Sequence, residues 1–192
     1  VCANLLIRGE SKTWPLSASI SSANFTPNSF ASRIGRRTGL VGYDRRYWLF
    51  LDWTGIFKDG YPGLLNLWLL EALDKAGRMA RLAGDGTRAR MYSGRSGRLR
   101  KALRALVRPD GLVADGLNWD GSQVDGTFPH TQTLALMTGL EGISERAITE
   151  RVLLPMLRGE ERPKASAYWI TYCFSALGGR GYGREVVECI RR

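Results

Sequence analysis

The chain has 192 residues, of which 44% are apolar and 24% charged, and its 28 Lys and Arg against 18 Asp and Glu give a formal charge of +10. This apolar fraction excludes a disordered chain, and the length suits one hydrophobic core or two small ones. No apolar run approaches the roughly 18 residues of a transmembrane helix, and three scattered cysteines exclude a disulfide framework or a CxxC metal site.

The N-terminal part of the chain differs in composition from the rest. Residues 1–32 are rich in Ser and Thr, carry few charges and show no hydrophobic period, which is typical of a loop or tail. We therefore expect residues 1–38 to form an irregular tail or linker and residues 39–192 to form the folded part. The sequence begins with Val1, and we expect the chain to be part of a longer protein.

The segment 47–55, YWLFLDWTG, concentrates four aromatic residues around one carboxylate. An indole ring can cover the apolar face of a pyranose while a neighbouring carboxylate accepts hydrogen bonds from hydroxyl groups. Asp52 and Trp53 are therefore candidate sugar-binding residues. The alternative is a buried core strand whose Asp caps the following turn.

Helical periodicity begins after Pro62. Residues 64–83 predict a helix that ends at Gly84, and residues 96–107 predict a second helix with Leu99, Leu103 and Leu106 on one face. Residues 78–108 hold ten basic residues and one acidic residue, so most of the excess charge lies here. A solvated helix face is the favoured interpretation, and an anionic partner is the alternative.

Residues 110–128 predict an irregular stretch in which four Asp-Gly pairs recur every five residues. Asp-Gly favours tight turns, so a string of turns or a small hairpin is the simplest interpretation. A connection this long is also often functional, and it carries Trp119 and Asp120. The spacing of its aspartates does not match a calcium-binding loop.

The C-terminal part predicts four more helices. The third helix begins at Pro129 and runs to Gly139, and the fourth follows Ser144 and is ended or kinked by Pro155. The fifth covers about 166–177 and the sixth about 183–191. The third and fifth are apolar on almost every face and the fourth and sixth are amphipathic, which favours inner and outer helices joined as αα-hairpins.

His130 is the single histidine of the chain. Without a second histidine or a nearby cysteine, a metal site is not expected, and no GxSxG elbow supports a serine triad. Glycine-rich phosphate-binding motifs are also absent from the sequence, so no cofactor is expected. The role of His130 is open between packing and a functional contact.

The order of these segments resembles the catalytic domain of bacterial α-L-rhamnosidases of glycoside hydrolase family 78. The resemblance covers about residues 39–192 and is carried by LFLDWTG, LWLLEALDKAGRMARLAGD, GLVADG and HTQTLALMTGL. It implies an all-α fold, a partial (α/α)6 six-hairpin toroid of about three αα-hairpins, with inner helices lining a sugar pocket. It also implies that Asp52, Trp53, Trp119, Asp120 and His130 line the pocket wall and bind substrate.

The same resemblance implies that this chain lacks the catalytic motifs of the family. The family hydrolyses terminal α-L-rhamnosides with inversion of configuration. Its catalytic acid comes from an upstream Arg-Glu motif and its base from a downstream Trp-Glu motif. This chain has no Trp-Glu pair, and its Arg184-Glu185 lies in the sixth predicted helix. We therefore expect a glycosidase fragment with no catalytic residue of its own.

The partners follow from this assignment. We expect a carbohydrate, with a terminal α-L-rhamnoside suspected, and the rest of the parent chain, but no nucleic acid and no membrane. Another six-hairpin carbohydrate-active enzyme and a non-catalytic carbohydrate-binding protein stay open as alternatives. The sequence does not assign a cellular compartment.

Overall fold

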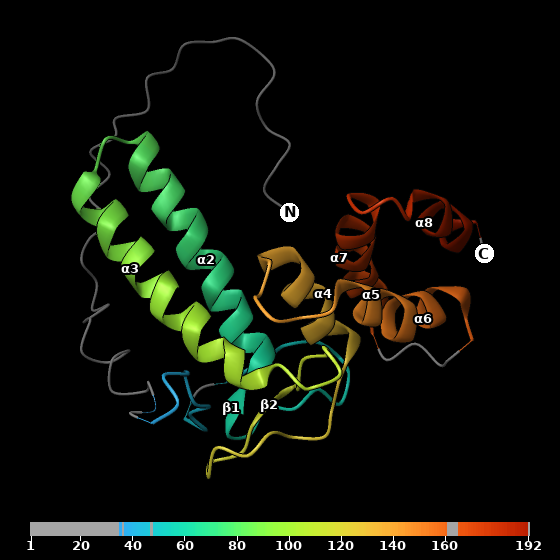
Figure 1. The fold of residues 1–192 in the computed structure, drawn as a ribbon, viewed down its shortest axis with the longest axis horizontal. Coiled ribbons are helices and arrows are strands. Elements are labelled where there is room, and N and C mark those ends of the chain that lie inside the picture. Colours follow the sequence, from blue (N-terminus) through green and yellow to red (C-terminus); the bar gives the residue numbers. More distant parts are fainter. Residues whose placement is uncertain (1–34, 36, 47, 161–164, 192) are drawn as a thin grey trace.

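The computed structural model describes residues 35, 37–46, 48–160 and 165–191 and confirms the predicted all-α fold (Figure 1). Within these residues two short strands, β1 (Tyr61–Pro62) and β2 (Gly116–Leu117), pair antiparallel in a small sheet. The predicted N-terminal tail lies almost entirely outside the described residues. No helix among the described residues is long and apolar enough to cross a membrane.

The helices form three successive pairs that pack in two rows. One row holds α2, α4 and α7, because α4 contacts both α2 and α7; the other elements lie outside it, with α3 on α2 and α8 on both α6 and α7 (Figure 1). This agrees with the predicted hairpins of inner and outer helices. The bounds are α2 Gly63–Leu82, α3 Gly86–Leu103, the 3-10 turn η1 Arg104–Leu106, α4 Pro129–Thr138, α5 Glu145–Ile148, the π-helical turn η2 Thr149–Leu153, α6 Leu154–Arg158, α7 Ala167–Gly178 and α8 Gly183–Ile190.

The start of α3 is a correction to the prediction, because the helix begins at Gly86 rather than near residue 96. Asp85 caps it by accepting a hydrogen bond from the backbone N–H of Arg88 at 2.8 Å. Gly94 and Gly97 weaken the helical propensity of this segment, and its arginines hide the hydrophobic period. Packing of Ala89, Ser96 and the leucines that follow onto the rest of the protein compensates for that weakness.

Pro155 does not end the fourth predicted helix. The chain passes through the π-helical turn η2 and continues as α6 to Arg158. A proline ring clashes with the carbonyl four residues earlier, and a widened turn before Pro155 relieves that clash.

The burial of the two apolar helices differs. Nine of the ten residues of α4 are buried, as expected of an inner helix, with Met137 the exception. In α7, by contrast, the buried residues are Trp169, Cys173, Ala176 and Leu177, and Tyr168 is 55% exposed. The prediction that α7 is covered on almost every side therefore does not hold within the part of the chain that the structure describes.

Residues 110–128 form the predicted string of turns around a small hairpin. An isolated bridge joins Val107 to Val113 ahead of β2, and a second joins Leu117, the last residue of β2, to Gln123. Gly111 and Gly121 have positive φ values of 81° and 94°, which explains why the turns at these Asp-Gly pairs need glycine.

Candidate functional site

The segment that contains Asp52 and Trp53 is irregular, so the alternative of a buried strand is wrong. Asp52 is buried at 4% exposure, whereas Trp53 is 77% exposed. Trp48 and Phe50 stack with ring centroids 5.4 Å apart, and the Phe50 ring meets Trp53 edge-on at 4.7 Å. The segment thus presents three aromatic rings at the surface above a buried carboxylate.

The Asp52 carboxylate joins three parts of the chain. Its Oδ2 lies 2.6 Å from His130 Nε2 in the first turn of α4 and accepts a 3.0 Å hydrogen bond from the backbone N–H of Ser166, the N-cap of α7. Its Oδ1 accepts a 2.8 Å hydrogen bond from the backbone N–H of Trp53. Asp52 therefore fixes the aromatic segment onto the N-terminal ends of two helices of the inner row.

The environment fixes the protonation states of this pair. Burial alone would raise the pKa of the Asp52 carboxyl, but hydrogen bonds from His130, Ser166 and the Trp53 backbone hold that pKa at about 2. Burial lowers the pKa of the His130 imidazole, against the opposing influence of Asp52. Near neutral pH the pair is therefore a carboxylate that accepts the Nε2–H of a neutral imidazole.

The start of α4 uses every polar side chain of its HTQT sequence to hold distant segments. His130 binds Asp52, and Thr131 Oγ1 donates to Asp115 Oδ1 at 2.6 Å. The Gln132 amide pairs with both the N–H and the carbonyl of Val113, at 3.0 and 2.6 Å. A buried helix can carry these groups because most of them find a partner, with His130 Nδ1 the exception among the described residues of this helix start.

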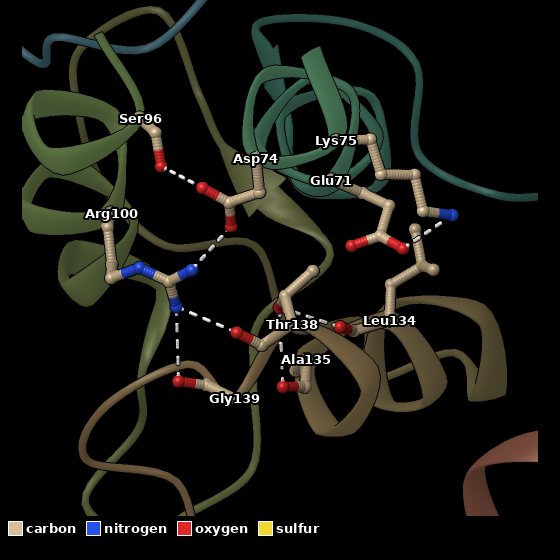
Figure 2. A network of polar contacts seen from close by, with 9 residues as sticks. All are labelled: Glu71, Asp74, Lys75, Ser96, Arg100, Leu134, Ala135, Thr138 and Gly139. Carbon is tan, nitrogen blue, oxygen red and sulfur yellow. Dashed lines mark hydrogen bonds and ion pairs between the residues drawn. The ribbon is translucent and has the colours of Figure 1, made fainter. Parts of the chain in front are cut away.

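The C-terminal end of α4 is held by two arginines. Arg100 of α3 donates to the carbonyls of Thr138 and Gly139 and forms an ion pair with Asp74 of α2 at 2.8 Å (Figure 2). Arg180 donates to the carbonyl of Leu136 at 2.7 Å. These cations satisfy terminal carbonyl groups and complement the helix dipole, so α4 is fixed at both ends.

Aromatic side chains of α2 and α7 continue from His130. The Trp169 ring lies 4.5 Å from the imidazole and 4.9 Å from Tyr172, and both Trp169 and Tyr172 meet Trp68 edge-on. Tyr168, which is exposed, shares a 3.0 Å hydroxyl hydrogen bond with Tyr172. The Asp52–His130 pair therefore lies between the surface rings of residues 48–53 and a second aromatic cluster.

Trp119 and Asp120 belong to a different part of the surface. Trp119 is 56% exposed, its Nε1–H donates to Asp59 at 3.1 Å, and its ring meets Tyr61 at 5.3 Å. The Asp120 carboxylate accepts from the N–H and hydroxyl of Ser122, which closes its own turn. The contacts of these two residues are thus distinct from those that join Asp52, Trp53 and His130.

The described residues contain no group of three or more His, Cys, Asp or Glu side chains that could hold a metal ion. Burial raises the pKa of Cys173 to about 11, so its thiol stays protonated at neutral pH and is a poor nucleophile. The described residues of this region supply hydrogen-bonding groups and aromatic rings.

Sequence analysis missed Ser166, Trp169 and Asp115 as parts of this site. Ser166 directly precedes an apolar helical run, which is a visible N-cap signal, but its N–H bond to Asp52 spans 114 residues. In the sequence Asp115 is one of the four aspartates in the Asp-Gly pairs of residues 110–128. No local pattern separates it from Asp110 or Asp120, although it is buried and accepts from the backbone N–H of Phe128.

Comparison with known proteins supports the fold. No known protein family matches the sequence, and no curated protein does. Among solved structures, a GH78 family rhamnosidase of Bacillus sp. GL1 is similar, with a TM-score of 0.69 and 23% sequence identity over 86% of this chain. The chain spans 17% of the length of that enzyme. This likeness shows a shared all-α fold.

Proposed function

We propose that this chain forms part of the sugar-binding wall of a protein related to glycoside hydrolases, and that Trp53 contacts the sugar. The observation that carries the proposal is an exposed indole anchored directly beside a buried, fully hydrogen-bonded carboxylate. An exposed Trp ring is costly to leave in water, and stacking on the apolar face of a pyranose is a common use for one. The likeness of the fold to a rhamnosidase agrees with this proposal.

In this proposal Asp52 and His130 position the wall rather than act on the substrate. A general acid needs a raised pKa near the working pH, whereas the pKa of Asp52 is about 2. Three hydrogen bonds also occupy its oxygens. The catalytic carboxylates belong, in this proposal, to parts of the protein outside this chain, as the resemblance to the rhamnosidases implies. The chain alone should then bind sugar and leave glycosides intact.

Trp119 and Asp120 would form a second patch of the wall. The two patches lie on separate loops with separate hydrogen-bond partners. Terminal α-L-rhamnose is the proposed unit at Trp53.

Calorimetric titration with L-rhamnose tests the proposal. The chain should bind the sugar, and Trp53→Ala should abolish the heat signal. Leu82→Ala, which removes another exposed apolar side chain at the end of α2, should bind like the unaltered chain. Equal binding by both variants would contradict the proposed role of Trp53.

The two alternatives predict other results. A different six-hairpin enzyme would prefer another sugar, such as an unsaturated uronide, in the same titration. A non-catalytic carbohydrate-binding protein would bind rhamnose, and the longer parent protein would bind it without hydrolysis. Turnover of an aryl α-L-rhamnoside by this chain, lost in Asp52→Ala, would show that Asp52 is catalytic and refute the positioning role.

A further inference from the structure

The outward face of α3 carries a line of cations without partners. Arg90, Arg98 and Lys101 are exposed and recur at i, i+8 and i+11, which places them on one side of the helix. Among the described residues none of the three forms an ion pair or a side-chain hydrogen bond. The helix itself contains no acidic residue that could neutralise them.

Several arginines beside this line are paired, whereas Arg95 of α3 is exposed and, like the three, forms no ion pair among the described residues. Arg88 pairs with Asp85, Arg100 with Asp74, and Arg104 with Glu141. The same holds for arginines on other helices, including Arg146 with Glu150, Arg180 with Glu145 and Arg184 with Glu188. Within the described residues of α3, the cations without an ion pair are therefore the three of the line and Arg95, which lies to one side of it.

Two glycines lie on the same face, between the cations. A Cβ added at Gly97 would meet nothing within 4 Å, and one at Gly94 would meet only the Arg98 guanidinium at 3.7 Å. Packing therefore does not require glycine here, although each glycine costs a helix about 1 kcal/mol relative to alanine. The glycines leave the helix backbone open to close approach along the line of cations.

We propose that this basic stripe, defined as Arg90, Gly94, Gly97, Arg98 and Lys101, binds an anionic polysaccharide whose carboxylates pair with the three cations. Arginine guanidinium groups bind carboxylates in a bidentate manner, and the stripe is about 16 Å long, which suits several sugar units of an extended chain. The inference rests on the proposed function, since it assigns acidic groups to the glycan that the protein recognises.

A nucleic acid fits this face less well. A duplex presents two phosphate strands across a groove about 12 Å wide, whereas these cations form a single line and the opposite side of α3 packs on α2. A single strand is normally held by aromatic side chains that stack on its bases, and the stripe contains none. A single polyanionic chain without bases is the occupant that matches these features.

Binding of polygalacturonate, measured by fluorescence anisotropy of the labelled polymer at low salt, tests the proposal. The triple variant Arg90→Gln, Arg98→Gln and Lys101→Gln should bind about tenfold more weakly, because each exposed pair contributes modestly and the three act together. Glutamine keeps the helical propensity. Binding by the unaltered chain should weaken steeply as salt is added, and neutral dextran should not compete.

A matched control removes the same charge elsewhere. Arg146→Gln, Arg184→Gln and Arg191→Gln lie outside the stripe and should leave polygalacturonate binding within about twofold. An equal loss in both triple variants would show a net-charge effect and overturn the proposal. Tighter binding of duplex DNA through the same three residues would assign the stripe to nucleic acid and overturn it as well.

The proposed function is tested separately. The stripe variant should bind L-rhamnose like the unaltered chain, while Trp53→Ala should lose rhamnose binding. If Trp53→Ala binds L-rhamnose like the unaltered chain, the proposed function has failed. If the stripe variant binds polygalacturonate like the unaltered chain, the further inference has failed.

Discussion

Acidification should destabilise the protein through the single histidine of the chain. The His130 side chain is fully buried, and its burial lowers the pKa of the imidazole from an ordinary value of 6.5 despite the neighbouring Asp52 carboxylate. In the unfolded chain the imidazole regains its ordinary pKa. Below pH 6.5 the unfolded chain therefore binds a proton that the folded protein excludes. The free energy of unfolding consequently decreases as the pH is lowered.

The size of the effect follows from this linkage. The slope approaches about 1.4 kcal/mol per pH unit below pH 6.5 and flattens once the folded protein also takes up the proton. Between pH 7.5 and 5.5 the loss can reach about 1.4 kcal/mol. Because the sequence contains one histidine, few other side chains titrate in this interval.

Urea unfolding followed by circular dichroism at half-unit pH steps measures this slope. The matched variant is His130→Gln, whose amide can still donate to Asp52 but does not titrate, and its stability should be nearly constant across the interval. A stability that rises on acidification would show that His130 is protonated in the folded protein and paired as an ion with Asp52. That result would refute the assigned protonation states.

Four further substitutions test the contacts around the site and the glycines of the fold. Asp52→Asn should lower the free energy of unfolding by about 2 kcal/mol at pH 7, because the folded pKa of about 2 lies below the ordinary value of 3.8. This stability is complete above pH 3.8 and is lost as the pH falls to 2, so the variant should lose less stability than the unaltered chain between pH 4 and pH 2. Urea unfolding that shows the same loss in both proteins would contradict this. Gln132→Ala should lower the free energy of unfolding by about 2 kcal/mol or more, because it leaves the buried N–H and carbonyl of Val113 without the Gln132 amide. Hydrogen exchange of the Val113 amide should become faster, and an unchanged exchange rate would argue against the contact. Gly97→Ala should raise the free energy of unfolding by about 1 kcal/mol, because its new Cβ meets nothing and alanine favours the helix. Gly126→Ala should lower it, because its new Cβ would collide with the Asp115 carboxylate. The midpoint of thermal unfolding should therefore shift in opposite directions in the two variants.

Helix order could be predicted from the sequence because hydrophobic period and end signals are local. Pro129 at the start of α4 and Ser144 before α5 each mark a boundary that the structure confirms, and the helix predicted from about residue 166 begins at Ala167. The first part of α3 could not be predicted, because Gly94 and Gly97 lower the local propensity and packing onto the rest of the protein decides the outcome.

The candidate site shows a similar division. Residue types and motifs single out Asp52, Trp53 and His130, but the hydrogen bond between Asp52 and His130 joins residues 78 apart in the chain. The exposure of Trp53 and the burial of Asp52 depend on how the 48–55 segment lies across α4 and α7, which no local pattern encodes. The placement of Trp119 and Asp120 on a separate loop is likewise a tertiary result.

The direct test of the sugar-binding wall is the indole N–H resonance of Trp53 during titration with L-rhamnose. A nitrogen-15 spectrum of the full chain, with the Trp53 signal assigned from Trp53→Phe, reports contact at this ring alone. We expect the Trp53 signal to shift with added sugar while the signal of Trp68 of α2, which packs on Trp169 and Tyr172 of α7, stays in place. A Trp53 signal that does not move at saturating rhamnose would contradict the account.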